Sequence, residues 1–250
     1  MPAAIDPSTV RAVVFDIGGV FLIPHHERIR PALAEAGIDV PPDDAAFHRA
    51  HHVAVHAISE AVRGGQIQPD EGSALTWEVY DTAYFSTAGV PGDQIAAASV
   101  VREAQRRHGA SGVWVYPLQA NIAAFARLMS ERPELERAIV SNNDGSAEQQ
   151  MLDHRVCQVG PGELPEVAMV IDSGLIGVAK PDPAIFAPVL DSLSAAPGEI
   201  LYVGDTYQSD VLGATAAGLQ VVQLDPYDLH HDYDHARVPD VDALADLLTA

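Results

Sequence analysis

Asp16 is the first residue of this chain whose type and position fit a chemical role. It follows a short apolar run, residues 13–15, and precedes Gly18 and Gly19. The run is typical of a buried strand. An aspartate at such a strand end, beside glycines, lies where backbone amides can approach an anion. By itself, Asp16 fits equally well an aspartate that only caps a turn.

Ser141 has a comparable position at the end of a second apolar run, residues 138–140, and Asn142 follows it. A hydroxyl together with the next backbone amide, here that of Asn142, can hold a phosphoryl oxygen. A serine at this place is also common as an ordinary cap between a strand and a helix. Ser141 alone therefore leaves both interpretations open.

Lys180 lies in a loop that Pro181 and Pro183 stiffen, and Pro183 can start the helix that follows. The chain has only 14 basic residues, so a lysine in an otherwise apolar and acidic loop calls for a reason. An ammonium group there can neutralise a phosphate and a nearby aspartate. The alternative is a solvated lysine.

Asp205 and Asp210 complete the set of candidate residues. Asp205 comes after the apolar run 200–203 and Gly204, and Asp210 follows five residues later. Carboxylates gathered near Asp16 would repel one another unless a cation lay among them. Hard oxygen ligands, few of them from protein, favour Mg²⁺. Asp210 alone would also fit an acid at the start of a helix.

The elements that carry these residues alternate between strands and helices. Strands are expected at residues 13–15, 138–140, 200–203 and 219–224, with a weaker one at 167–171, and helices at 121–129, 184–193 and 210–217. This alternation predicts an α/β fold, a Rossmann-like parallel sheet covered by helices on both faces.

The stretch from residue 23 to residue 112 has no strand signal. Helical patterns cover residues 25–36, 43–62, 71–85 and 93–108. We therefore expect two domains, an α/β core of residues 1–22 and 113–250 and an all-helical insertion of residues 23–112. Such an insertion would lie over the carboxyl ends of the strands, where open α/β sheets bind ligands.

In this order and spacing, the motifs resemble those of the haloacid dehalogenase-like (HAD) hydrolase superfamily. Its pattern is a strand ending in a nucleophilic aspartate, a strand ending in serine or threonine, a lysine before a proline-rich loop, and a strand ending in Gly-Asp with an acid shortly after. The resemblance runs from residue 11 to residue 224, and the helical insertion matches the cap that members carry after the first motif. The matching stretches are Val13-Val14-Phe15-Asp16-Ile17-Gly18-Gly19-Val20, Ile139-Val140-Ser141-Asn142, Gly177-Val178-Ala179-Lys180-Pro181-Asp182-Pro183 and Val203-Gly204-Asp205 with Asp210.

The resemblance implies a Mg²⁺-dependent phosphatase that acts on a small phosphorylated metabolite through an aspartyl-phosphate at Asp16. Ser141 and the amide of Asn142 would hold the phosphoryl oxygens, and Lys180 would supply compensating charge. The metal site would comprise Asp16, the carbonyl of Gly18, Asp205 and Asp210, the last orienting Asp205 or a metal-bound water.

Gly18 departs from the family pattern, because most phosphatases of the family have a second aspartate there as general acid and base. That help is typically worth about 10²–10⁴ in rate. The leaving group then needs little protonation, or a cap residue or solvent does the work, or the protein is a weakly active or non-catalytic phosphate binder. Cleavage of a 2-haloacid at Asp16 is a further alternative, although the acidic pair Asp205 and Asp210 argues for a metal that dehalogenases do not need.

Composition excludes several other functions. A net charge of −21, from 35 acidic and 14 basic residues, disfavours binding to nucleic acid and to anionic membrane surfaces. Neither a signal peptide nor an apolar run long enough to span a membrane is visible, so we expect a cytoplasmic protein. Cys157, the single cysteine, is expected to be buried and inert. No feature indicates an oligomeric state.

The remaining polar clusters are expected to be structural. His25 and His26 are interpreted as exposed residues of the hinge, with contact to the site as the alternative. His48, His52 and His56 share one helix face and are interpreted as a polar face rather than a metal site. We interpret a late polar stretch as an exposed loop; it contains His230, His231, Asp232, Asp234 and His235. We interpret a set of aromatic residues as the core of the insertion; they are Trp77, Tyr80, Tyr84 and Phe85.

Overall fold

The computed structural model describes residues 5–69, 73–106 and 115–250, and the chain forms two compact units. Unit 1 comprises Met1–Phe21 and Pro117–Ala250, and unit 2 comprises Leu22–Tyr116. The boundary expected between residues 112 and 113 lies outside the described residues. No helix within the described ranges is both long and apolar enough to cross a membrane.

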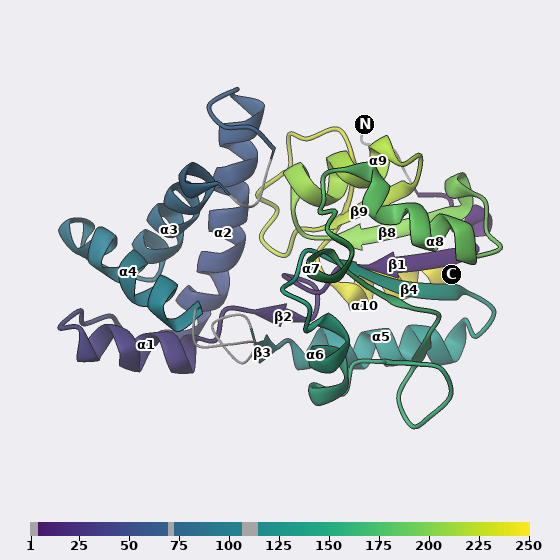
Figure 1. The fold of residues 1–250 in the computed structure, drawn as a ribbon, viewed down its shortest axis with the longest axis horizontal. Coiled ribbons are helices and arrows are strands. Elements are labelled where there is room, and N and C mark those ends of the chain that lie inside the picture. Colours follow the sequence, from purple (N-terminus) through teal and green to yellow (C-terminus); the bar gives the residue numbers. More distant parts are fainter. Residues whose placement is uncertain (1–4, 70–72, 107–114) are drawn as a thin grey trace. The chain divides into compact units, whose positions relative to one another are not determined.

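Unit 1 is built on a six-stranded sheet in the order β10-β9-β8-β1-β4-β7 (Figure 1). All neighbouring pairs are parallel, so the predicted α/β class with a parallel sheet is confirmed. β1 lies between β4 and β8, and Phe15 is in register with both Ile139 and Val203. The strands are β1 (Ala12–Phe15), β4 (Glu136–Ser141), β7 (Val170–Asp172), β8 (Ile200–Gly204), β9 (Gln220–Leu224) and β10 (Ala236–Val238).

Helices cover both faces of this sheet, which explains why every residue of β1 is buried. Ala12 and Val14 pack with Phe186 and its neighbours in one hydrophobic cluster. Phe15 contacts Phe125 with ring centroids 5.2 Å apart. The helices are α5 (Gln119–Glu131), α6 (Ala147–Asp153), α7 (Ser173–Ile176), α8 (Ala187–Ser192), α9 (Leu212–Ala216) and α10 (Val241–Thr249).

Several predicted elements of unit 1 differ in detail from the structure. The helix expected at residues 210–217 begins as a π-helical turn, Tyr207–Val211, and continues as α9. The helix expected at 184–193 is a 3₁₀ turn, Pro183–Phe186, followed by α8. The weak strand expected at 167–171 is divided between β6 (Glu166–Val167), which pairs with β5 (Gln158–Val159), and β7.

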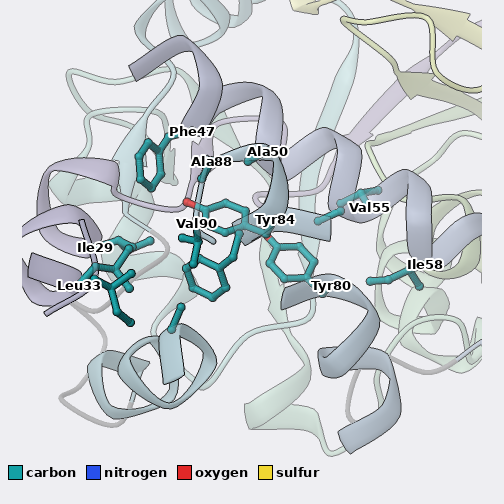
Figure 2. Close-up of a cluster of buried hydrophobic side chains, with 14 of the residues drawn as sticks. Ile29, Leu33, Phe47, Ala50, Val55, Ile58, Tyr80, Tyr84, Ala88 and Val90 are labelled. Carbon is teal, nitrogen blue, oxygen red and sulfur yellow. The ribbon is translucent and has the colours of Figure 1, made fainter. Parts of the chain in front are cut away.

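In the described residues of unit 2, four α-helices pack around one apolar cluster, which Figure 2 shows. Asp43 caps the start of the longest helix by accepting a hydrogen bond from the amide of Ala46. Tyr80, Tyr84 and Phe85 are buried in the cluster, and Trp77 packs against it, so their interpretation as core residues is confirmed. The helices are α1 (His26–Glu35), α2 (Asp44–Arg63), α3 (Ala74–Thr87) and α4 (Ile95–Arg106).

A short strand pair marks the two places where the chain passes between the units. β2 (Leu22–Ile23) pairs with β3 (Tyr116–Pro117). Residue 71, where the third expected helix begins, and residues 107 and 108, where the fourth ends, lie outside the described residues. Unit 2 is thus a separate cluster of helices, inserted into the chain directly after β1 and its turn.

Candidate active site

The carboxyl end of the sheet brings three of the predicted residues to one edge. Asp16 follows the last residue of β1, and its amide donates a hydrogen bond to the carbonyl of Val203 at 2.8 Å. Ser141 is the last residue of β4, and Asp205 follows the end of β8. Because these three neighbouring strands are parallel and in register, their ends lie side by side. All three side chains are buried.

The turn after Asp16 requires glycine at Gly19 but not at Gly18. Gly19 has a φ of +63°, and a Cβ added there would lie 1.9 Å from Oδ2 of Asp205. Glycine is therefore needed both for the left-handed backbone and for the close approach of Asp205. A Cβ at Gly18 would have as its nearest neighbour Oδ2 of Asp16, at 4.0 Å. Space for a side chain thus exists at the position where the family pattern has its second aspartate.

Lys180 joins the carboxylates into one network. Its ammonium nitrogen lies 3.0 Å from Oδ1 of Asp16 and 2.7 Å from Oδ1 of Asp210, and it donates a hydrogen bond to the hydroxyl of Tyr202 at 2.9 Å. Only 3% of Lys180 is exposed, so the interpretation as a solvated lysine is wrong. The ammonium is held where it can offset the negative charge of Asp16 and of an oxyanion beside it.

Asp210 is fully buried, and both of its carboxylate oxygens accept hydrogen bonds. Oδ1 accepts from Lys180 and Tyr202, and Oδ2 accepts from the amide and hydroxyl of Thr206 at 2.8 and 2.7 Å. Burial raises the pKa of Asp210, but the charge of Lys180 and these hydrogen bonds outweigh burial and hold the pKa below its usual range. Asp210 is therefore an ionised partner of Lys180. A Cβ on Gly204 would lie 2.2 Å from Cγ of Asp210, so glycine is required there too.

The loop after Ser141 is held by hydrogen bonds to two other segments, those of Lys180 and Asp172. The side chain of Asn142 accepts a hydrogen bond from the amide of Lys180 at 2.8 Å and donates one to its carbonyl at 3.0 Å. The buried carboxylate of Asp172 accepts from the amides of Gly145 and Ala147. The Asn142 side chain therefore holds the Lys180 loop, which leaves its backbone amide as the group that can meet a phosphoryl oxygen.

The carboxylates at this edge fit a hard cation. Oxygen atoms of Asp16, Asp205 and Asp210 all lie within 4.8 Å of one another. Lys180 can offset one of these three negative charges, and Mg²⁺ prefers carboxylate and carbonyl oxygens. The donor set therefore suits this ion. Since Lys180, Tyr202 and Thr206 already engage the oxygens of Asp210, Asp16 and Asp205 are the better placed carboxylate ligands.

Three residues of this network were not singled out by their sequence context. Tyr202 lies within the apolar strand β8, where it resembles a core residue, yet its hydroxyl meets Lys180 and Asp210. Thr206 follows Asp205 and binds Asp210. Asp172 ends β7. The available signal was position: Asp172 and Thr206 are polar residues at or just past strand ends, as Asp16 and Ser141 are.

Two expectations about histidines are wrong. His26 is 1% exposed rather than an open hinge residue, because it packs between the rings of Phe47, His48 and Tyr116. In the late polar stretch, His230 and His235 are buried whereas His231 is exposed.

The histidines of α2 differ in their burial. His48, His52 and His56 are half-buried on α2. The neighbouring His51, which had not been singled out, is buried with Nδ1 2.9 Å from the hydroxyl of Tyr80. Cys157 is buried, as expected, and burial raises its pKa to about 12.

Known proteins resemble this chain in sequence. A family model for haloacid dehalogenase-like hydrolases matches residues 10–218. Phosphoserine phosphatase from Thermus thermophilus is 34% identical over 110 residues, 44% of this chain and 41% of that protein. Glyceraldehyde 3-phosphate phosphatase from Methanopyrus kandleri is 42% identical over 55 residues, 22% of this chain and 24% of that protein. The matched segments span less than half of either relative.

Solved structures show the same fold. The HAD-hydrolase YfnB from Bacillus subtilis, bound to magnesium, superimposes with a TM-score of 0.59 at 15% identity, covering 96% of this chain and 99% of that one. A dehalogenase superimposes with a TM-score of 0.53 at 17% identity, covering 99% of this chain and 100% of that one. Given the match over residues 10–218, this chain belongs to the haloacid dehalogenase-like hydrolase family.

Proposed function

We propose that this chain is a phosphatase that hydrolyses phosphate monoesters of small metabolites, with Asp16 as its nucleophile. The observation that carries the proposal is the contact of 3.0 Å between Oδ1 of Asp16 and the ammonium of Lys180. Ser141 and Asp205 lie at the same carboxyl edge of the sheet. An ionised carboxylate held beside a fixed positive charge is a competent nucleophile. The curated relatives named above are phosphatases, which supports the same reaction class.

The proposed reaction has two displacements at phosphorus. In the first, an oxygen of Asp16 forms a bond to phosphorus while the bond to the alcohol oxygen breaks, and that oxygen takes a proton from water. In the second, water attacks the aspartyl-phosphate, the bond from phosphorus to Asp16 breaks, and inorganic phosphate leaves with the carboxylate restored. Ser141, the amide of Asn142 and Lys180 would hold the equatorial oxygens, where negative charge is concentrated.

Mg²⁺ is the proposed metal cofactor, held by Asp16, Asp205 and the carbonyl of Gly18. When bound, it would reduce the repulsion between the carboxylate nucleophile and the phosphoryl oxygens. Asp210 belongs to the same cluster, but its hydrogen bonds to Lys180, Tyr202 and Thr206 support a different role. We assign it as the residue that positions Lys180.

Unit 2, Leu22–Tyr116, is proposed to be the cap that recognises the leaving group. It is inserted directly after the turn that carries Asp16, and ligands of open α/β sheets bind at the carboxyl edge of the strands. The proposed cap extends to residue 116, slightly beyond the expected residues 23–112. His48, His52 and His56 are half-buried on its helix α2 and are the proposed hydrogen-bonding groups of the cap.

A phosphate-release screen of phosphorylated metabolites tests the proposal. The parent with Mg²⁺ should release phosphate, Asp16→Asn should lose at least about 10³-fold in kcat because the nucleophile is removed, and Asp191→Asn, on an exposed aspartate of α8, should match the parent. Equal rates for Asp16→Asn and the parent would show that Asp16 is not the nucleophile.

EDTA and beryllium fluoride separate the alternatives. Loss of phosphate release in EDTA supports the metal. Activity on a 2-haloacid that survives EDTA would indicate a dehalogenase instead. Formation of a beryllofluoride adduct at Asp16, without turnover of any phosphate ester, would indicate the phosphate-binding alternative that Gly18 raises.

A further inference from the structure

Gln223 on β9 links the edge of the active site to the polar stretch that follows this strand. The side chain is completely buried. Its amide nitrogen donates a hydrogen bond to the backbone carbonyl of Asp205 at 2.7 Å, and its amide oxygen lies 2.6 Å from Nε2 of His235. A glutamine with both ends engaged in a buried site is held in one orientation.

The chemistry of the partners determines how this network is arranged. A carbonyl oxygen can only accept, so the end of Gln223 that meets Asp205 is its NH₂ group. The other end is therefore the amide oxygen, and Nε2 of His235 must carry a hydrogen. Burial, helped by Arg237, lowers the pKa of His235 to about 4, so the ring is neutral at pH 7 and holds that single hydrogen.

A second contact reaches the same segment from its other end. Tyr207, two residues after Asp205, stacks against the ring of His235 with centroids 5.8 Å apart and meets the ring of Tyr233 at 4.8 Å. Asp205 is thus held through its carbonyl, and the backbone just beyond it is held through the ring of Tyr207.

The stretch between β9 and β10 is itself held in place. The carboxylate of Asp225 accepts hydrogen bonds from the amides of Leu229 and His230 at 2.9 and 2.8 Å, and its own amide donates to the carbonyl of Val238. These bonds return the chain toward Gln223 and bury His230 and His235. The stretch that was expected to be an exposed loop is therefore held by hydrogen bonds beside Gln223.

The geometry points to Gln223 and His235 as positioning residues that set the metal affinity of the site by fixing the segment from Asp205 to Tyr207. This inference rests on the proposed function, because it takes Asp205 as a ligand of Mg²⁺. Groups that orient metal ligands typically change metal affinity by about 10–100-fold when they are replaced. Aspartate has a short side chain, so any movement of the backbone at Asp205 would also move its carboxylate.

The test is titration of Mg²⁺ into the purified full chain by isothermal calorimetry, without substrate. Gln223→Leu should raise the Kd for Mg²⁺ by about 10–100-fold. Hydrogen exchange should accelerate in a peptide that covers residues 204–211. His235→Phe keeps the ring beside Tyr207 but cannot donate to Gln223, and it should raise the Kd by a smaller factor.

Gln220→Leu is the matched control. Gln220 lies on the same strand, and its side chain also donates to a backbone carbonyl at 2.7 Å, that of Gly198, at the opposite end of β9. It should leave the Kd for Mg²⁺ and the exchange of residues 204–211 unchanged. If Gln223→Leu does not fold, His235→Phe decides the question alone.

The outcomes separate this inference from the proposed function. Tight Mg²⁺ binding by the parent, with the same Kd in Gln223→Leu or His235→Phe, would overturn the positioning role and leave the metal site intact. An equal loss in Gln220→Leu would also overturn it, because the effect would then be general. No Mg²⁺ binding by the parent would overturn both the metal site and the inference.

Discussion

Replacing Gly18 by aspartate should give this enzyme the general acid that its family usually has at that position. The nearest heavy atom to a Cβ on Gly18 is Oδ2 of Asp16, at 4.0 Å, which is ordinary contact distance or slightly beyond. The backbone there is not in the left-handed region, unlike that of Gly19. The substitution therefore needs no backbone change.

The expected gain in rate follows from the position of the new carboxyl group. It would lie beside the carboxylate of Asp16, and a neighbouring negative charge raises the pKa of a carboxylic acid. A raised pKa favours the protonated form that can donate to a leaving oxygen. General acid–base catalysis is worth about 10²–10⁴ in rate, or about 2.7–5.5 kcal/mol of barrier.

The assay compares kcat/KM for two kinds of phosphate ester in the presence of Mg²⁺. An alkyl phosphate has a poor leaving group and should be hydrolysed about 10²–10⁴-fold faster by Gly18→Asp. An aryl phosphate such as p-nitrophenyl phosphate leaves readily without a proton and should gain little. Gly18→Asn, with similar shape but no acid, is the control and should give no gain on either ester.

Two results would refute this reasoning. An equal gain on both esters would mean that the new side chain does not act by protonating the leaving group. A gain in Gly18→Asn would mean that shape rather than acidity is responsible.

Gly19→Ala gives the contrasting case, because its Cβ would lie 1.9 Å from Oδ2 of Asp205. Gly19→Ala should therefore abolish activity, whereas Gly18→Ala should not.

Three further predictions concern buried groups. Asp210→Asn removes the nearer of the two carboxylates beside Lys180, at 2.7 Å, and leaves Asp16 at 3.0 Å. Urea unfolding should therefore show a loss of about 3 kcal/mol, the lower end for a broken buried ion pair; a change below about 1 kcal/mol would argue against a tight buried pair. Cys157, with a pKa of about 12, should resist iodoacetamide at pH 8 in the folded protein and react once the chain is unfolded in guanidinium, and rapid labelling of the folded protein would contradict its burial. Burial alone would raise the pKa of Asp225, but hydrogen bonds from His230 and Leu229 outweigh burial and lower the pKa from a usual 3.8 to about 2. The ionised form of Asp225 therefore stabilises the fold above about pH 4, and this stabilisation is lost as the pH falls toward 2. Asp225→Asn should accordingly flatten the acid limb of stability against pH, and an unchanged limb would count against this assignment.

The sheet and the order of the site residues were accessible from the sequence for a local reason. A strand buried on both faces is an uninterrupted apolar run, so β1, β4 and β8 could be recognised without knowledge of their neighbours. Asp16, Ser141 and Asp205 follow directly on such runs. Because parallel strands end at one edge, their proximity follows from the fold class.

Burial of the histidines was not accessible in this way. His230 and His235 occur among charged residues, and His26 beside another histidine, so local composition favoured exposure. Gln223 alone has no feature that marks it as a partner of Asp205. A polar side chain is buried when a distant segment supplies its hydrogen bonds. The spacing of residues in the sequence does not indicate which distant segment that is.

The sequence by itself determined the fold class and the strand ends that carry the reactive side chains. Only the tertiary structure decided which groups meet: Lys180 with both Asp16 and Asp210, and Gln223 with the carbonyl of Asp205. The physical reason is that strand and turn preferences depend on neighbouring residues, whereas a buried charge is tolerated only through partners that the folded chain brings from far away.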